Sequence, residues 1–267
     1  MPLQPTLFIS HGAPNIVLHD SPARRFFDGL AGRLSRPDAI VVASAHYETE
    51  GPAVCVSARP RTIHDFYGFE PELYDMQYPA QGDPSLASRI AQLLTQSLGR
   101  TVAADENWGL DHGAWNPLSR IYPEADIPVV AVSIAPAADP AYHCALGRAL
   151  SALREENVLL IGSGSMTHNL KRLMRDAPAS AGPPDWVAGF MGWCETQLIV
   201  GEEEALLGYR EAAPFARDNH PTDEHFLPLF FAMGAAGEGW RAERWHHSLS
   251  HGSLVMDTWA FLAASGQ

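Results

Sequence analysis

Residues 39–47 read AIVVASAHY, and residues 157–164 read NVLLIGSG. Both are short, nearly continuous apolar runs that end in small or polar residues. Such runs are typical of strands buried on both faces of a sheet, because a half-exposed strand would alternate apolar with polar residues. Further strand-like runs occur at 6–10, 53–58, 126–134 and 253–261.

Helical patterns lie between these runs, at 21–35, 84–99, 141–157 and 185–201. Alternation of strands and helices predicts an α/β fold in which a central, largely parallel or mixed sheet is flanked by helices on both faces. The Pro-, Gly- and Ala-rich stretch 176–185 is interpreted as a loop and not as a domain linker. Residues 1–267 are therefore expected to form a single domain.

Composition narrows the range of functions. The chain has 267 residues, a formal net charge of −13 and a pI near 5.3, so no nucleic-acid partner is expected. Three widely spaced cysteines, without any CxxC pair, fit a reducing cytoplasm better than a disulfide framework. No signal peptide and no membrane-spanning segment are recognised, so a cytoplasmic location without membrane attachment is expected.

Five of the twelve histidines follow strand-like runs or stand at a helix-start signal beyond one. Each has Gly, Ser, Asp, Asn or Pro beside it. Ligands bind at strand ends in α/β proteins, and histidine is both the commonest metal ligand and a proton-transfer group. The pattern therefore predicts a metalloenzyme. The five are His11, His46, His112, His168 and His225.

Each of these histidines also has a structural interpretation. His46 ends a strongly apolar strand and could instead be a hydrogen-bonded core residue. His11, before Gly-Ala-Pro, could be an exposed loop residue. His225 follows the helix-start signal Pro221-Thr222, and a helix beginning there would aim it at the strand ends. Glu224 and Asp223 are further candidate ligands, and His220 is a weaker one.

His168 and His112 are candidates for chemistry beside the metal. The Gly-Ser-Gly run before His168 is interpreted as a loop that approaches a ligand closely, so His168 could ligate metal or transfer protons. Asp111 could orient the His112 ring, although a simple Asx turn explains it equally well. His64 is another loop histidine, and the cluster of His246, His247 and His251 is interpreted as mostly structural. GxSxG, GxGxxG, P-loop and HExxH motifs are absent from the sequence.

Several of these segments resemble the class III extradiol ring-cleaving dioxygenases of the LigB superfamily, and within it the 4,5-DOPA-dioxygenase-like branch. The block at 62–80, with TIHDF, GF, LYD and YPA, is specific to that branch. The resemblance covers most of the chain. Its segments are SHGAPN (10–15), ASAHYE (43–48), TIHDFYGFEPELYDMQYPA (62–80), WGLDHGAWNPL (108–118), IPVVAVSI (127–134), GSGSMTHNL (162–170), PTDEHFLPL (221–229) and HGSLVMDTWAF (251–261).

The resemblance implies one mononuclear divalent metal, Fe(II) for activity, held by His11, His46 and His225. It makes His168 the acid/base beside the metal and His112 a contact for substrate or O₂. The broader superfamily has a carboxylate where this chain has His225. Three neutral imidazoles also suit zinc, so zinc can occupy the site in purified protein.

The leading functional hypothesis is cleavage of a single-ring catechol with O₂ to a muconic semialdehyde, the catechol being DOPA-like or otherwise para-substituted. No organic cofactor is implied. Basic residues near the motifs are scarce, Arg61 and Lys171 being the nearest, which favours a broad catechol preference. A zinc-dependent hydrolase with the same histidine cluster is the alternative, and a metal-dependent binding protein is a third. The sequence assigns no oligomeric state.

Overall fold

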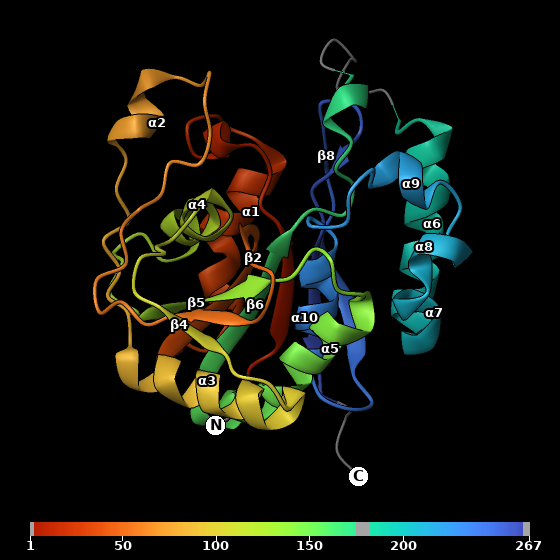
Figure 1. Ribbon diagram of the computed structural model, residues 1–267. Helices are drawn as coiled ribbons and strands as arrows, with labels where there is room; N and C mark the ends of the chain where they lie inside the picture. The colour runs from red at the N-terminus through yellow and green to blue at the C-terminus, as the bar shows by residue number, and fades with distance from the viewer. Residues whose placement is uncertain (1–2, 175–181, 264–267) are drawn as a thin grey trace.

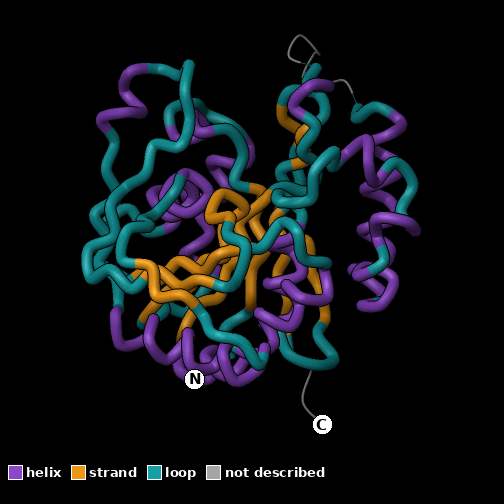
Figure 2. Tube along the Cα trace, viewed as in Figure 1, coloured by secondary structure: helices purple, strands orange, loops and turns teal. Residues whose placement is uncertain are grey.

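The computed structural model describes residues 3–174 and 182–263, and it contains a central eight-stranded sheet (Figures 1 and 2). The strand order is β4-β3-β5-β2-β6-β1-β10-β7, and β8 pairs with β9 in a separate small hairpin. The strands are β1 (Thr6–Ser10), β2 (Ala39–Glu48), β3 (Ala53–Cys55), β4 (Ala103–Asp105), β5 (Val129–Ile134), β6 (Val158–Gly164), β7 (Arg241–His246), β8 (Leu249–Ser250), β9 (Leu254–Val255) and β10 (Thr258–Leu262).

The α-helices connect and flank these strands. They are α1 (Pro22–Leu30), α2 (Pro71–Asp75), α3 (Pro84–Leu98), α4 (His112–Ile121), α5 (Pro140–Ala149), α6 (Asp185–Val200), α7 (Glu203–Leu207), α8 (Tyr209–Ala212), α9 (Ala216–Asn219) and α10 (Leu227–Ala235). Four 3₁₀ segments accompany them: η1 (Pro14–Val17), η2 (Ala31–Arg33), η3 (Ser151–Glu156) and η4 (Leu170–Arg172).

The sheet is mixed, as the sequence predicts. Its centre, β5-β2-β6-β1, is parallel throughout. Both edges contain antiparallel pairs, β3 with β5 on one side and β10 with β1 and β7 on the other. The parallel centre places the carboxyl ends of β1, β2 and β6 side by side, which is the edge where α/β proteins bind ligands.

Strand β2 shows why its apolar run is continuous. Ile40 and Val42 pack in the cluster that includes residues of α1 and α4, whereas Val41 and Ala43 pack in the cluster that includes residues of α3 and α5. Both faces of the strand are therefore buried under helices, as a doubly covered sheet requires. Helices α6 to α9 stand together to one side, where α6 contacts β7 (Figure 1).

Some element boundaries differ from the sequence predictions. The run at 53–58 forms a strand only over Ala53–Cys55, and the run at 253–261 is divided between β9 and β10. The helical pattern at 141–157 changes from α5 to 3₁₀ geometry in η3, and the pattern at 21–35 changes from α1 to η2. The predicted loop 176–185 lies mostly outside the described residues. Within residues 3–174 and 182–263, none of the helices combines the length and the apolar character needed to cross a bilayer.

Candidate active site

The carboxyl ends of three parallel strands bring His11 and His46 together. Strand β6 lies between β1 and β2, with Ser10 of β1 opposite Gly164 of β6. His11 follows β1 directly, and its backbone N–H donates to the Gly164 carbonyl at 3.0 Å. His46 lies near the end of β2, and its Nε2 is 3.2 Å from the Nε2 of His11. Residues 35 apart in sequence thus present ring nitrogens to one point.

His225 reaches the same point from the segment before α10. The helix begins at Leu227, so the predicted helix start near residue 221 is wrong; Pro228, whose fixed φ suits a first turn, stands at its beginning. The Ser165 N–H donates to the His225 carbonyl at 2.8 Å. A Cβ added to Gly164 would lie 2.1 Å from that carbonyl oxygen, so glycine allows the close approach. The Gly-Ser-Gly run thus lies in β6 and not in a loop.

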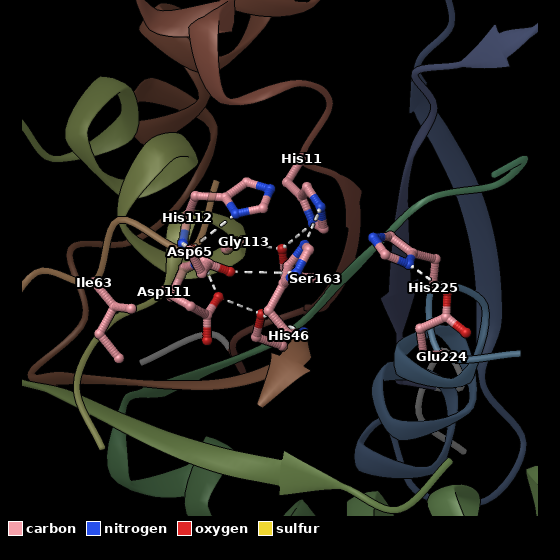
Figure 3. Close-up of polar contacts among 12 residues, drawn as sticks. His11, His46, Ile63, Asp65, Asp111, His112, Gly113, Ser163, Glu224 and His225 are labelled. Atoms are coloured by element: carbon pink, nitrogen blue, oxygen red, sulfur yellow. Dashed lines mark hydrogen bonds and ion pairs between the residues drawn. The ribbon is translucent and has the colours of Figure 1, made fainter. Parts of the chain in front are cut away.

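The rings of His11, His46 and His225 converge, as Figure 3 shows. One ring nitrogen from each lies within 4.8 Å of the others. Ring centroids are 5.0 Å apart for His11 and His46, 4.9 Å for His46 and His225, and 5.4 Å for His11 and His225. The three histidines that the resemblance implies as ligands are therefore neighbours in the structure.

Hydrogen-bond partners fix the tautomers of two of these rings. The Ser163 hydroxyl donates to the Gly113 carbonyl, so at 3.0 Å it accepts a hydrogen bond from His11 Nδ1. Glu224 Oε1, an acceptor when ionised, is 3.0 Å from His225 Nδ1. Both rings then carry their proton on Nδ1, and Nε2 keeps its lone pair for a metal.

The donor set fits a first-row divalent ion. Asp65 Oδ2 lies 3.3 Å from His46 Nδ1, which favours the same tautomer in the third ring. The Nε2 atoms of His11 and His46 are 3.2 Å apart. Without an ion one of them can donate a hydrogen bond to the other, and with both ring protons on Nδ1 the two lone pairs can bind one cation between them. Two imidazole nitrogens each about 2.1 Å from one ion are separated by roughly 3.0–3.4 Å at octahedral or tetrahedral angles.

His168 lies against this group from one side. Its ring stacks on that of His225, with centroids 3.3 Å apart and planes 13° from parallel. Its Nδ1 is 3.8 Å from Glu224 Oε1. Its backbone N–H donates to the Asn219 carbonyl at 2.9 Å, and the predicted basic helix after it is only the 3₁₀ segment η4.

His112 lies against the group from the other side, as the first residue of α4. Asp111 is the N-cap of that helix and accepts from the Ala114 N–H and the Ser44 hydroxyl, whereas the sequence suggested either an Asx turn or orientation of the His112 ring. The carboxylate that faces the ring is Asp65, whose Oδ1 is 3.0 Å from His112 Nδ1. The ring centroids of His112 and His46 are 4.0 Å apart.

Burial keeps these imidazoles neutral. It lowers the pKa of His11 and of His225 well below the usual value, and neighbouring histidines lower both further. It lowers the pKa of His46 to about 3 and that of His168 to about 4. Burial alone would raise the pKa of Asp65, but its contacts with the rings of His112 and His46 lower it to about 2. The site therefore combines neutral rings, which can bind metal, with an ionised carboxylate.

The five histidines line one cavity of about 550 Å³. Aromatic and aliphatic side chains form much of the remaining wall, and Tyr67, at 91% exposure, stands at the rim. The other lining residues are Gly12, Ala13, Pro14, Asn15, Phe66, Gly68, Phe69, Ser165, Leu170, Leu173, His251 and Leu254. Such a mostly apolar pocket with a few convergent polar groups is typical of a small-molecule site.

Asp223 and His220, which the sequence also suggested as ligands, lie outside the group formed by His11, His46 and His225. Asp223 accepts from the Tyr209 hydroxyl and pairs with Arg210. His220 is fully buried with Nε2 2.9 Å from the Met166 carbonyl oxygen, away from the ligand group. Neither is among the described groups of side chains that could share a metal ion, whereas Glu224 is.

Two of the three C-terminal histidines make structural contacts, and the third lines the cavity. His246 faces Ser248, and His247 faces the buried carboxylate of Asp257 at 2.7 Å. His251, which the sequence interpretation grouped with them, lines the cavity. Its φ of 47° marks a turn conformation that sequence spacing does not reveal.

The chain matches the family described as "Catalytic LigB subunit of aromatic ring-opening dioxygenase" over residues 6–256. This span includes every residue of the site described above. The protein belongs to the LigB family, and the enzyme class expected from the sequence, an aromatic ring-opening dioxygenase, is confirmed.

Individual relatives of the chain have more specific names than the family. The chain is 44% identical to "4,5-DOPA dioxygenase extradiol" of Beta vulgaris over 262 residues, covering 97% of each chain. It is 41% identical to the protein of the same name from Escherichia coli K12 over 235 residues, covering 86% of this chain and 84% of the relative. A crystal structure of an uncharacterized protein from Escherichia coli K12 superposes with a TM-score of 0.80 at 35% identity, covering 96% of this chain and 99% of that one.

Proposed function

We propose that residues 1–267 act as one catalytic domain that cleaves a single-ring catechol with O₂ in the extradiol sense, giving a muconic semialdehyde. The observation that carries the proposal is the group formed by His11, His46 and His225, which opens into a cavity between two further imidazoles, His112 and His168. Membership of the LigB family and relatives named extradiol dioxygenases support it.

In this proposal His11, His46 and His225 bind the metal through Nε2. A bound Fe(II) would bring catechol and O₂ together and allow charge to pass between them. The chain's own contribution is to keep the three rings neutral by burial and to hold their Nδ1 protons toward Ser163, Asp65 and Glu224. The rings are then positioned before metal or substrate arrives.

His168 is proposed to transfer protons. Its burial-lowered pKa of about 4 leaves it neutral at physiological pH, so it can accept a proton. Since Nδ1 faces Glu224, Nε2 is the nitrogen available to a catechol hydroxyl. After accepting that proton, the same nitrogen can return it later in the reaction. Stacking on His225 keeps the ring beside the metal-binding group.

His112 is proposed to contact the reacting oxygens. Asp65 faces its Nδ1 at 3.0 Å, which leaves Nε2 for substrate or O₂. The Phe66 ring stands edge-on to His112, with ring centroids 5.8 Å apart. Phe66 and Phe69 belong to the cavity wall and are suited to contact an aromatic ring and to exclude water.

The cavity suits a range of para substituents. No Lys or Arg is among the residues that line it in the described ranges, and Arg61 lines a different hollow beside Trp108. Besides the five histidines, the polar side chains that line the cavity are the uncharged ones of Asn15, Tyr67 and Ser165 and the imidazole of His251. We therefore expect catechols with and without an amino-acid side chain to be cleaved with similar efficiency.

The test is oxygen consumption by protein loaded anaerobically with Fe(II), measured against a panel that includes L-DOPA, caffeate and 4-methylcatechol. Uptake of O₂ together with a yellow product supports the proposal. The competing zinc hydrolase predicts no uptake, and metal-dependent hydrolysis of esters or amides under anaerobic conditions. If the protein binds one equivalent of iron and consumes no O₂ with any catechol of the panel, the dioxygenase assignment is contradicted.

A further inference from the structure

Two carboxylates in the site each face two of its imidazoles. Asp65 lies between the rings of His46 and His112, with Oδ2 3.3 Å from the first Nδ1 and Oδ1 3.0 Å from the second. Glu224 lies between His225 and His168, with Oε1 3.0 Å and 3.8 Å from their Nδ1 atoms. Each carboxylate therefore joins one ring of the metal-binding group to one ring beside it.

We propose that Asp65 and Glu224 are paired positioning residues of this site. Each places its negative charge beside the Nδ1 of one metal-binding ring and of one ring that faces substrate, where the charge favours the Nδ1–H tautomer, and together they supply the negative charge that a ligand set of three imidazoles lacks. The inference rests on the proposed function for the roles of the rings. The contacts themselves are independent of it.

The charge argument follows from the donor set. Three neutral imidazoles leave the full +2 charge of a divalent ion uncompensated. The side chains of Asp65 and Glu224 are only 20% and 16% exposed, and each carboxylate faces a ring that would bind the ion. Their two negative charges would offset the +2 without occupying a coordination position. Coordination positions then remain open for both oxygens of a catechol and for O₂.

The backbone around Asp65 is built to hold it. The His112 N–H donates to Asp65 Oδ1 at 3.0 Å. Two residues earlier, the Ile63 N–H donates to the Leu110 carbonyl and the Trp115 indole donates to the Ile63 carbonyl. These contacts attach the Asp65 loop to the first turn of α4, as Figure 3 shows in part. A positioning role requires such support.

Glu224 is held by the turn that leads into α10. The Asp223 carbonyl accepts from the N–H groups of Phe226 and Leu227, and the Tyr209 hydroxyl donates to the Asp223 carboxylate. Next along the chain, the His225 carbonyl accepts from Ser165 at the end of β6. Glu224 is thus fixed between two anchored residues and turns its carboxylate toward both rings.

The test compares Asp65→Ala and Glu224→Ala with Glu155→Ala. Glu155 is an exposed carboxylate in η3, before the opposite end of β6 from the site, and its side chain makes no hydrogen bond or ion pair in the described part of the chain. Zinc affinity is measured by competition with a chromophoric chelator. Each positioning variant should bind zinc about 10–100-fold more weakly, as is typical when an outer partner of a ligand is removed. The control should change less than about 2-fold.

A second readout separates positioning from general structural support. Long-range ¹H–¹⁵N correlation spectra of the zinc-loaded protein report which ring nitrogen carries the proton. Wild type should show Nδ1–H for both His112 and His168. Asp65→Ala should change only the tautomer population of His112, and Glu224→Ala only that of His168. Since neither readout needs turnover, the outcome is independent of whether catechols are cleaved.

Three results would overturn the proposal. One is Nε2–H tautomers of His112 and His168 in the wild type. Another is zinc affinity in both positioning variants equal to that of Glu155→Ala, with circular dichroism showing a native fold. The third is a second zinc ion bound by either carboxylate and its two rings, which would make Asp65 or Glu224 a ligand. If an alanine variant fails to fold, Asp65→Asn and Glu224→Gln, which keep the side-chain volume and remove the charge, replace it.

Discussion

Adding one methyl group at Gly164 should displace His225, the proposed metal ligand 61 residues further along the chain. A Cβ at this position would lie 2.1 Å from the His225 carbonyl oxygen, and 3.3 Å from the Phe8 ring. Nonbonded heavy atoms settle at about 3.5 Å or more, so the segment around His225 must retreat by more than about 1 Å. Backbone atoms cannot relieve this contact by a rotamer change.

The size of the effect follows from that displacement. Metal–ligand distances tolerate about 0.2 Å, and a misplacement of about 1 Å at a reacting group can cost about 10²-fold in rate. Overpacking a buried contact costs about 1–3 kcal/mol, which for a chain of this size lowers Tm by several degrees. We therefore expect Gly164→Ala to fold, to melt earlier and to bind metal far more weakly.

The assay measures zinc affinity, iron-dependent turnover and Tm on Gly164→Ala and on Gly192→Ala. Gly192 lies exposed within α6, and a Cβ there meets nothing within 4 Å. The control should bind metal normally and gain about 0.5–1 kcal/mol, because alanine favours a helix interior over glycine. Native metal affinity and turnover in Gly164→Ala would refute the claim that close packing of β6 places His225.

Four other changes have definite expected outcomes. His11→Ala should lose bound metal and turnover together, whereas His168→Ala should keep its metal, by elemental analysis, and lose turnover about 10²–10⁴-fold. Chelation should lower Tm; zinc or Fe(II) should restore it, but only Fe(II) should restore oxygen uptake. Burial lowers the pKa of His143 from 6.5 to about 4. The buried neutral ring therefore contributes its full stability above pH 6.5, and this contribution is lost as the pH falls toward 4. Between pH 6.5 and pH 4, the free energy of unfolding measured in urea should therefore fall less for His143→Gln than for wild type, by up to about 3 kcal/mol.

The parallel centre of the fold could be predicted because its signal is local. The apolar runs of β1, β2, β5 and β6 are continuous, which only strands covered on both faces need. Helix α4 was not predicted: it begins with Asp-His-Gly and contains Pro117, and these residues favour a loop when read alone. In the structure Asp111 caps the helix, and its buried first turn packs beside β2. Tertiary packing outweighs the weak local propensity.

Part of the candidate site could likewise be predicted from the sequence, and part of it could not. The histidines could be selected because each stands near a strand end or a helix start, and strand ends converge in an α/β fold. Asp65 could not be selected, since one carboxylate in an acidic chain has no distinguishing local signal; only its two distances to ring nitrogens identify it. Ser163 could not be assigned its role from the sequence either, because its contact with His11 Nδ1 depends on the pairing of β1 with β6.

The measurement that tests the central claim most directly is mass spectrometry of the product formed under ¹⁸O₂ by Fe(II)-loaded protein and a para-substituted catechol. The proposed reaction predicts a semialdehyde that carries both heavy oxygen atoms, apart from aldehyde oxygen exchanged with water. His168→Ala with iron bound should form this product far more slowly. A dicarboxylic acid from intradiol cleavage, a quinone, or a product without heavy oxygen would contradict the account.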